Sequence, residues 1–237
     1  MNHRRKMTVF ATILLLEATG CAFNPGASMQ KSTPSVEASV APLVQEGKIS
    51  LYASEEKDGL YHHIAIDEGQ GEQVQHYDWD TVSNPGYEPM IHEQDLNGDG
   101  QAEMIVITTK GYGTGVYISE AHVIERQQQT EVAVEDALAY TKAHVSFSVV
   151  HQSGTSSIRA AVTDQPAVEL SLKATDKNEL PQFGNIIDYR LDEDHTLTAE
   201  VAAQLADGEA VGTAILHYQW DQGTMKVSQI TFEAVAS

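Results

Sequence analysis

The sequence has almost no thiols. Cys21 is the only cysteine among 237 residues. A single thiol cannot form an intramolecular disulfide, and it cannot supply the paired thiolates of a structural zinc site. Disulfide-stabilised folds and thiolate metal centres are therefore excluded.

Basic residues are also scarce. The chain has 14 lysines and arginines against 34 acidic residues, which gives a net charge of −20. Such a surface repels phosphate backbones and anionic lipid headgroups, so we expect no nucleic-acid partner. Cations and basic partners fit this charge. Because 41% of the residues are hydrophobic, we expect a folded protein and not a disordered acidic tail.

The one long apolar run lies near the start of the chain, at Met7–Leu16. It follows the basic segment 1–6 and is too short for a permanent transmembrane helix, which is the pattern of a signal peptide over residues 1–20. The small residues 18–20 before Cys21 resemble a lipobox. That resemblance implies a lipid on the Cys21 thiol and an extracytoplasmic protein anchored to the cell membrane. The alternative is an ordinary secretory signal with an incidental cysteine.

Familiar catalytic motifs are missing as well. The sequence contains neither G-x-S-x-G nor H-E-x-x-H. The glycine-rich segment Lys110–Val116 lacks the Gly-Lys-Ser/Thr and the following helix of a phosphate-binding loop. We expect the histidines to lie on solvated strand faces. An envelope hydrolase that uses acidic residues stays open as an alternative, because so many carboxylates can form pairs by chance.

Beyond residue 20, the pattern predicts a tether and then a mainly β protein. Ser, Pro and Ala dominate 21–47, which is typical of a flexible tether. Short alternating or apolar runs separated by turns predict strands. These lie at 49–54, 60–67, 73–80, 104–108, 116–125, 145–151, 157–163, 167–173, 183–191, 196–205, 210–220 and 224–233. One helix is expected at Val134–His144.

We expect two lobes of antiparallel sheet joined by that short helix. The first lobe covers 48–127, a helical connector covers 128–145, and the second lobe covers 146–237. The continuous apolar run Met104–Thr108 predicts a central strand that is buried on both faces. The last three strands are separated by short turns, which favours an antiparallel meander.

One loop carries a pattern for metal chemistry. Oxygen side chains stand at its positions 1, 3 and 5, which are Asp95, Asn97 and Asp99, and Gly100 permits a sharp turn at position 6. Oxygen ligands arranged in this way suit calcium. An EF-hand needs Glu at position 12, but that residue is Val106. Position 9 is Glu103, and an apolar strand follows it directly.

The loop and the strand after it resemble the FG-GAP/VCBS-type repeat, whose loops bind Ca²⁺ between β-propeller strands. The resemblance implies that Asp95, Asn97, Asp99, the Gln101 carbonyl and Glu103 are ligands. Only one copy is present, so a complete propeller is not expected. The wider chain is similar to lipoproteins of Gram-positive bacteria that carry a single such repeat, which implies no particular activity. An ordinary turn between strands remains the alternative for the loop.

These observations favour a non-catalytic binding or accessory module of the cell envelope, with a calcium-stabilised β scaffold. The partner would be an envelope protein, peptide or glycan. We expect several aromatic residues around the calcium loop, namely Tyr77, Trp79, Tyr87, Tyr112 and Tyr117. Of these, Tyr87 and Tyr112 are the candidates for a ligand-binding platform. Burial in the core is the alternative for them.

Overall fold

The computed structural model describes residues 41–69, 74–152, 155–170 and 180–235. The described residues are mainly β, with one α-helix among them and no complete propeller, as the sequence predicted. The expected signal peptide, Cys21 and the tether up to residue 40 lie outside the described residues. The end of the expected tether contains the short strand β1, because Leu43 and Val44 pack against a hydrophobic core.

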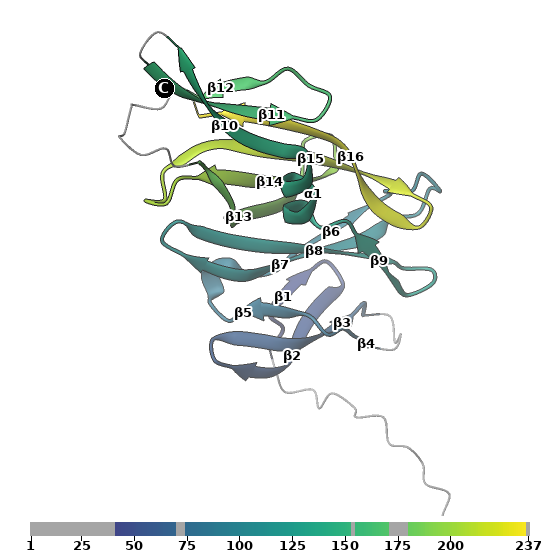
Figure 1. Ribbon diagram of the computed structural model, residues 1–237. Coiled ribbons are helices and arrows are strands. Elements are labelled where there is room, and N and C mark those ends of the chain that lie inside the picture. The colour runs from purple at the N-terminus through teal and green to yellow at the C-terminus, as the bar shows by residue number, and fades with distance from the viewer. Residues whose placement is uncertain (1–40, 70–73, 153–154, 171–179, 236–237) are drawn as a thin grey trace, which may run out of the picture. The chain divides into compact units, whose positions relative to one another are not determined.

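The small sheet is antiparallel and contains the first strands of the chain (Figure 1). Its order is β1-β2-β3-β4, and β5 pairs with another part of β3. A two-residue turn at Asp58 and Gly59 joins β2 to β3, and both residues have a positive φ, as this type of hairpin turn requires. The strands are β1 (Val44–Glu46), β2 (Ile49–Lys57), β3 (Leu60–Asp67), β4 (Gln75–His76) and β5 (Asp80–Val82).

The large sheet has eight strands in the order β13-β14-β15-β16-β9-β8-β7-β6. Its strands are β6 (Met90–Gln94), β7 (Glu103–Gly113), β8 (Val116–Glu125), β9 (Thr130–Val134), β13 (Gln182–Leu191), β14 (Leu197–Gln204), β15 (Ala210–Asp221) and β16 (Thr224–Ala234). The expected antiparallel meander is confirmed at β14, β15 and β16. Two short parallel pairings join the strands before the helix to those after it, β9 with β16 and β8 with β13.

Strands from both expected lobes therefore share one sheet (Figure 1). The segment 128–145, expected to be a helical connector, contributes strand β9 to this sheet before the helix begins. A third sheet of three strands follows the helix, in the order β10-β11-β12. These strands are β10 (Val145–Gln152), β11 (Thr155–Val162) and β12 (Val168–Leu170).

Two hydrophobic cores meet at β7. The large core is a buried cluster that includes Ile105, Ile107, Val123, Leu216 and Phe232. The small core consists of Ile49, Leu51, Ile64, Ile66, Trp79, Ile91, Met104, Val106 and Ile124. Because side chains alternate along a strand, Ile105 and Ile107 enter one core while Met104 and Val106 enter the other. The prediction of a central strand buried on both faces is confirmed.

The helix α1 (Ala137–His144) begins later than the sequence suggested. The Asp136 side chain accepts a hydrogen bond from Ala139 N at 2.6 Å and so caps the first turn. The Ala137 N–H donates to the buried Tyr189 hydroxyl at 3.1 Å. A short 3-10 helix, η1 (Pro85–Tyr87), precedes β6. Within the described ranges, no helix is long and apolar enough to cross a bilayer.

Candidate functional site

The candidate metal loop connects β6 to β7. Leu96 packs against the large core, so one end of the loop is fixed to the body of the protein. Gly98 and Gly100 have φ values of 77° and 88°, in the left-handed region that glycine adopts without strain. The backbone therefore curls back on itself between the two strands, as the sequence pattern required.

Two aspartates hold this curl together. Asp95 accepts a hydrogen bond from Gly98 N at 2.8 Å with one carboxylate oxygen, and from Gly100 N at 2.9 Å with the other. Asp99 accepts one from Gln101 N at 2.8 Å. These local bonds between side chain and backbone are the reason why acidic residues at alternate positions favour a tight loop over continued strand.

Glu103 closes the loop from the first position of β7. It is only 2% exposed, and its carboxylate accepts hydrogen bonds from Leu96 N at 2.7 Å and from Asn97 Nδ2 at 2.9 Å. Burial raises the pKa of the Glu103 carboxyl above its ordinary value. The charges of Asp99 and Asp95 add to that rise in pKa, and the hydrogen bonds from the loop oppose it. An ionised Glu103 is therefore costly to keep in this position without a compensating positive charge.

The side-chain amide of Asn97 is the group that approaches these acids. Its nitrogen donates to Glu103 at 2.9 Å and to Asp99 at 3.3 Å, while its oxygen accepts from Asp99 N at 2.8 Å. In the parts of the chain that the structure describes, no group of three or more His, Cys, Asp or Glu side chains is gathered closely enough to hold a metal ion. The ligand set Asp95, Asn97, Asp99, Gln101 and Glu103 remains a prediction, although its hard oxygen donors fit Ca²⁺.

A cavity of about 320 Å³ lies beside the end of the loop. It is lined by Gln101 and Glu103 from the loop side and by Arg126 from the turn after β8. The Arg126 guanidinium forms ion pairs with Glu68 and Glu93. Its charge is therefore already neutralised by carboxylates outside the loop.

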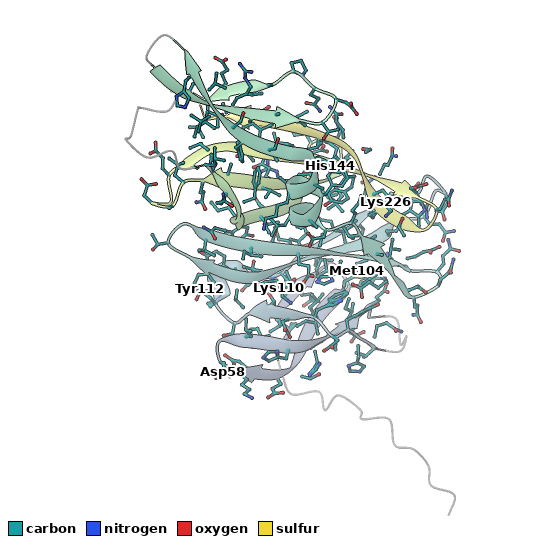
Figure 2. The ribbon with its side chains drawn as sticks, in the orientation of Figure 1. Asp58, Met104, Lys110, Tyr112, His144 and Lys226 are labelled. Atoms are coloured by element: carbon teal, nitrogen blue, oxygen red, sulfur yellow. The ribbon has the colours of Figure 1, made fainter. Side chains whose placement is uncertain are left out.

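The aromatic candidates lie elsewhere. Tyr112 and Met104 lie toward opposite ends of β7 (Figure 2). Tyr112 and Tyr117 face each other across the β7–β8 hairpin, at the opposite end of β7 from Glu103. At about 3.3 Å per residue this separation is roughly 30 Å. The expectation that these tyrosines surround the calcium loop was wrong, because an extended strand separates them from it.

Tyr87 and Tyr112 do lie together. Their rings stack with centroids 4.4 Å apart, and Tyr117 is 6.1 Å from Tyr87. Tyr112 is 44% exposed, so one aromatic surface remains open to solvent at the hairpin tip. The structure thus brings the two predicted residues together, but at the tip of the β7–β8 hairpin and not beside the loop 95–103.

His122 was missed by the sequence reasoning. We expected histidines on solvated faces, but His122 is only 5% exposed. Its Nδ1 lies 3.0 Å from Glu131 Oε1, its Nε2 lies 3.3 Å from Thr108 Oγ1, and its ring stacks on Trp79 at 3.9 Å. The same Glu131 oxygen accepts from Trp79 Nε1 at 3.0 Å. The signal was its place inside the apolar run of β8, where both strand faces are buried.

This buried network has a clear electrostatic consequence. Burial alone raises the pKa of the Glu131 carboxyl, but the hydrogen bonds from His122 and Trp79, together with the charge of His122, outweigh it and leave the pKa below the ordinary value. A pair of catalytic carboxylates needs one group kept protonated and one kept ionised. Glu131 is held in the ionised form by His122 of β8 and by Trp79 of the small core.

Comparison with protein-family models, with curated proteins and with solved structures gave no match.

Proposed function

We propose that this protein is a lipid-anchored, extracytoplasmic, non-catalytic binding or accessory module whose β scaffold is stabilised by calcium. The observation that carries the proposal is the loop 95–103. There, the buried Glu103, the carboxylates of Asp95 and Asp99 and the Asn97 amide belong to one glycine-rich turn that joins two strands of the large sheet.

The loop is suited to calcium by the chemistry of its donors. The side chains of Asp95, Asn97, Asp99 and Glu103 and the main-chain carbonyl of Gln101 would hold the ion. Calcium prefers six to eight oxygens and tolerates irregular geometry, and solvent would complete the set. A calcium ion held by these residues would supply positive charge beside the buried Glu103 and would link the end of β6 to the start of β7.

The anchor and the charge define where such a module would work. A lipid on Cys21 would hold the body at a membrane, and the segment 21–40 would act as the spacer. The body carries excess negative charge, so its partners would be cationic. A basic peptide or protein of the envelope fits better than a phosphate-rich polymer.

A thermal melt of the full chain in EDTA and in millimolar calcium tests the metal site. At a calcium concentration of about 100 times Kd, binding to the folded state alone adds roughly 2.7 kcal/mol. For a chain of this length that corresponds to a rise in Tm of about 5–10 °C. Asp99→Asn keeps an oxygen for the hydrogen bond from Gln101 N but removes the charge, and it should lose most of this rise.

Asp207→Ala is the matched control. Asp207 also accepts a hydrogen bond from a backbone N–H two residues on, at 3.1 Å from Glu209 N, but it lies in the β14–β15 turn outside the loop. Its variant should keep the full response to calcium. Identical melts in EDTA and calcium for the unsubstituted chain would refute the calcium scaffold. The anchor is tested separately, because Cys21→Ser should move the protein from the membrane fraction to the soluble fraction.

A further inference from the structure

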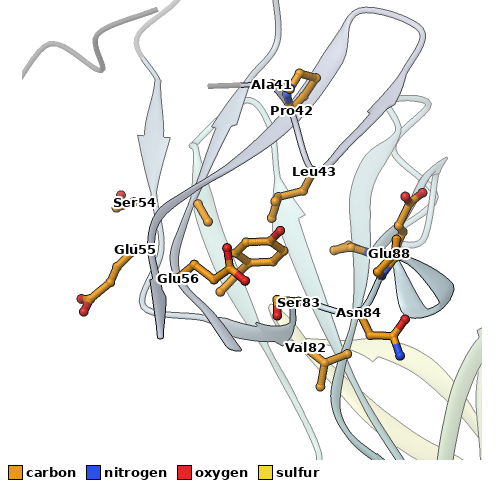
Figure 3. A pocket seen from close by; sticks show the side chains of 14 residues that line it. Ala41, Pro42, Leu43, Ser54, Glu55, Glu56, Val82, Ser83, Asn84 and Glu88 are labelled. Atoms are coloured by element: carbon orange, nitrogen blue, oxygen red, sulfur yellow. The ribbon is translucent and has the colours of Figure 1, made fainter. Parts of the chain in front are cut away.

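A groove of about 600 Å³ lies between the residues just before β1, the second half of β2 and the segment that joins β5 to η1 (Figure 3). From its shape, charge and backbone we infer that it binds an extended, lysine- or arginine-containing peptide segment of a partner protein. The inference rests on the proposed role as a binding module and names the class of its partner.

The floor of the groove is apolar. Leu43 and Tyr61 pack against the small core and are only partly covered, and Val82 beside them is buried. Leu43 points toward the centre of the groove (Figure 3). Such a floor accepts an aliphatic side chain, or the methylene stem of a lysine or arginine whose charged head stays at the rim.

The rim is acidic. Glu55, Glu56 and Glu88 line the groove, and no lysine, arginine or histidine does. Within the described residues, none of these three carboxylates forms an ion pair or a hydrogen bond. Glu56 points toward the centre of the groove, whereas Glu55 points away from it (Figure 3). A cationic head at the rim would therefore meet carboxylates that have no partner among the described residues.

The edge of strand β2 beside the groove can also pair with a peptide through its backbone. β1 pairs with β2 only at 49–51, and the last of these contacts is the hydrogen bond from Leu43 N to Leu51 O at 2.7 Å. Beyond Leu51, β2 continues to Lys57, and β3 on the other side is its only partner among the described strands. An extended peptide can add to such an edge as a further strand, which gives affinity through main-chain hydrogen bonds. Alternate side chains of the peptide would then point into the groove.

Charge decides between the possible occupants. The net charge of −20 and the acidic rim repel nucleic acids and anionic lipids. A second copy of this chain would bring its own Glu55 and Glu56 to the same edge, and like charges opposite each other destabilise strand pairing. A basic extended segment satisfies the floor, the rim and the strand edge together.

The test uses fluorescence anisotropy with the full chain in mild detergent. The probe is a labelled eight-residue peptide of alternating valine and lysine, and the control peptide has glutamate in place of lysine. We expect saturable binding of the basic peptide only, weakened by added salt because the rim pairs are exposed. Glu56→Gln should raise Kd about three- to tenfold, since a charge that faces the ligand is lost.

Glu55→Gln is the matched control, because it removes the same charge from the neighbouring position on the same strand. It should change Kd by less than about twofold. Methylation of alternate peptide amides should abolish binding if the β2 edge is paired. Equal binding of the acidic peptide, or equal effects of Glu55→Gln and Glu56→Gln, would overturn the inference. If no peptide binds but calcium still raises Tm, the docking site is wrong while the calcium scaffold stands.

Discussion

Replacing Leu216 by alanine should destabilise the whole described β body, including the small sheet. Leu216 lies on β15 and is fully buried in the large core. Truncation of a buried leucine removes its apolar surface and leaves a cavity, at a cost of about 2–5 kcal/mol. The question is whether this loss of stability is confined to the C-terminal strands or also affects the small sheet near the N-terminus.

The position of β7 between the two cores predicts that the loss of stability extends to the C-terminal strands and to the small sheet. Ile105 and Ile107 belong to the large core, while Met104 and Val106 belong to the small core. A strand that is buried on both faces cannot lose one core without exposing residues of the other. The two cores should therefore unfold together as one cooperative unit.

The two tryptophans allow this to be measured. Trp79 is a member of the small core, and Trp220 packs against the large core. Urea denaturation of Trp220→Phe and Trp79→Phe backgrounds reports each region separately by fluorescence. With an m-value of about 3 kcal/mol/M, the loss of 2–5 kcal/mol lowers the midpoint by roughly 0.7–1.7 M. We expect the same shift from both tryptophans.

Val235→Ala serves as the control, because Val235 is 56% exposed and its truncation should leave the midpoint nearly unchanged. A midpoint that falls for Trp220 while that of Trp79 stays constant would refute the reasoning. It would mean that the two cores are independent domains, as the division of the sequence into two lobes first suggested.

Two further predictions concern the stability of the protein at low pH and the steric effect of a side chain added at Gly212. Because the pKa of Glu131 in the folded protein lies below its ordinary value of 4.5, its ionised form stabilises the fold above about pH 4.5, and this contribution is lost as the pH falls through the folded-state pKa. Glu131→Gln should therefore lower Tm most at neutral pH, and the difference in Tm from the unsubstituted protein should shrink in melts below pH 4.5. A difference in Tm that grows in acid would contradict a lowered pKa for Glu131. At Gly212, an added Cβ would lie 2.7 Å from Glu233 O and would meet the Phe232 ring, so Gly212→Ala should cost about 1–3 kcal/mol in urea denaturation. Gly111→Ala, where nothing lies within 4 Å, should be near neutral, and equal effects of the two would show that crowding is not the cause.

Sequence patterns predicted those parts of the fold that depend on neighbouring residues. The strand expected at 116–125 coincides with β8, and the short turns between the last three strands occur where expected. The run 104–108 was predicted as buried on both faces because four apolar residues follow one another without a charged residue. In each case the pattern that determines the structure lies within a few residues along the chain.

The long-range pairings could not be predicted. β8 pairs with β13 only through Tyr117 and Ile118, and β9 pairs with β16 only through Ala133 and Val134. Two-residue contacts leave no periodic pattern in a sequence. As a result, the segments before and after the helix were expected to form separate lobes.

The candidate site likewise has features that neighbouring residues predict and features that depend on long-range packing. The curl of the loop 95–103 follows from its glycines and from aspartates at alternate positions, and the structure contains it. The burial of His122 and the distance of Tyr112 from the loop depend on how strands pack and extend through space. Those features required the three-dimensional arrangement.

The two parallel contacts also have a consequence for the time course of folding. β8 meets β13 across Ile118 and Ile187, and β9 meets β16 across Ala133 and Thr224, so each contact closes a long stretch of chain. Closing such loops costs entropy before any contact is gained, which slows folding. During synthesis, β6 to β9 are complete while the edge that β13 and β16 will cover is still bare. The folding intermediate with the exposed strand edge, and hence the greatest tendency to aggregate, is therefore the N-terminal half of this protein. It persists until almost the last residue of the chain has been synthesised.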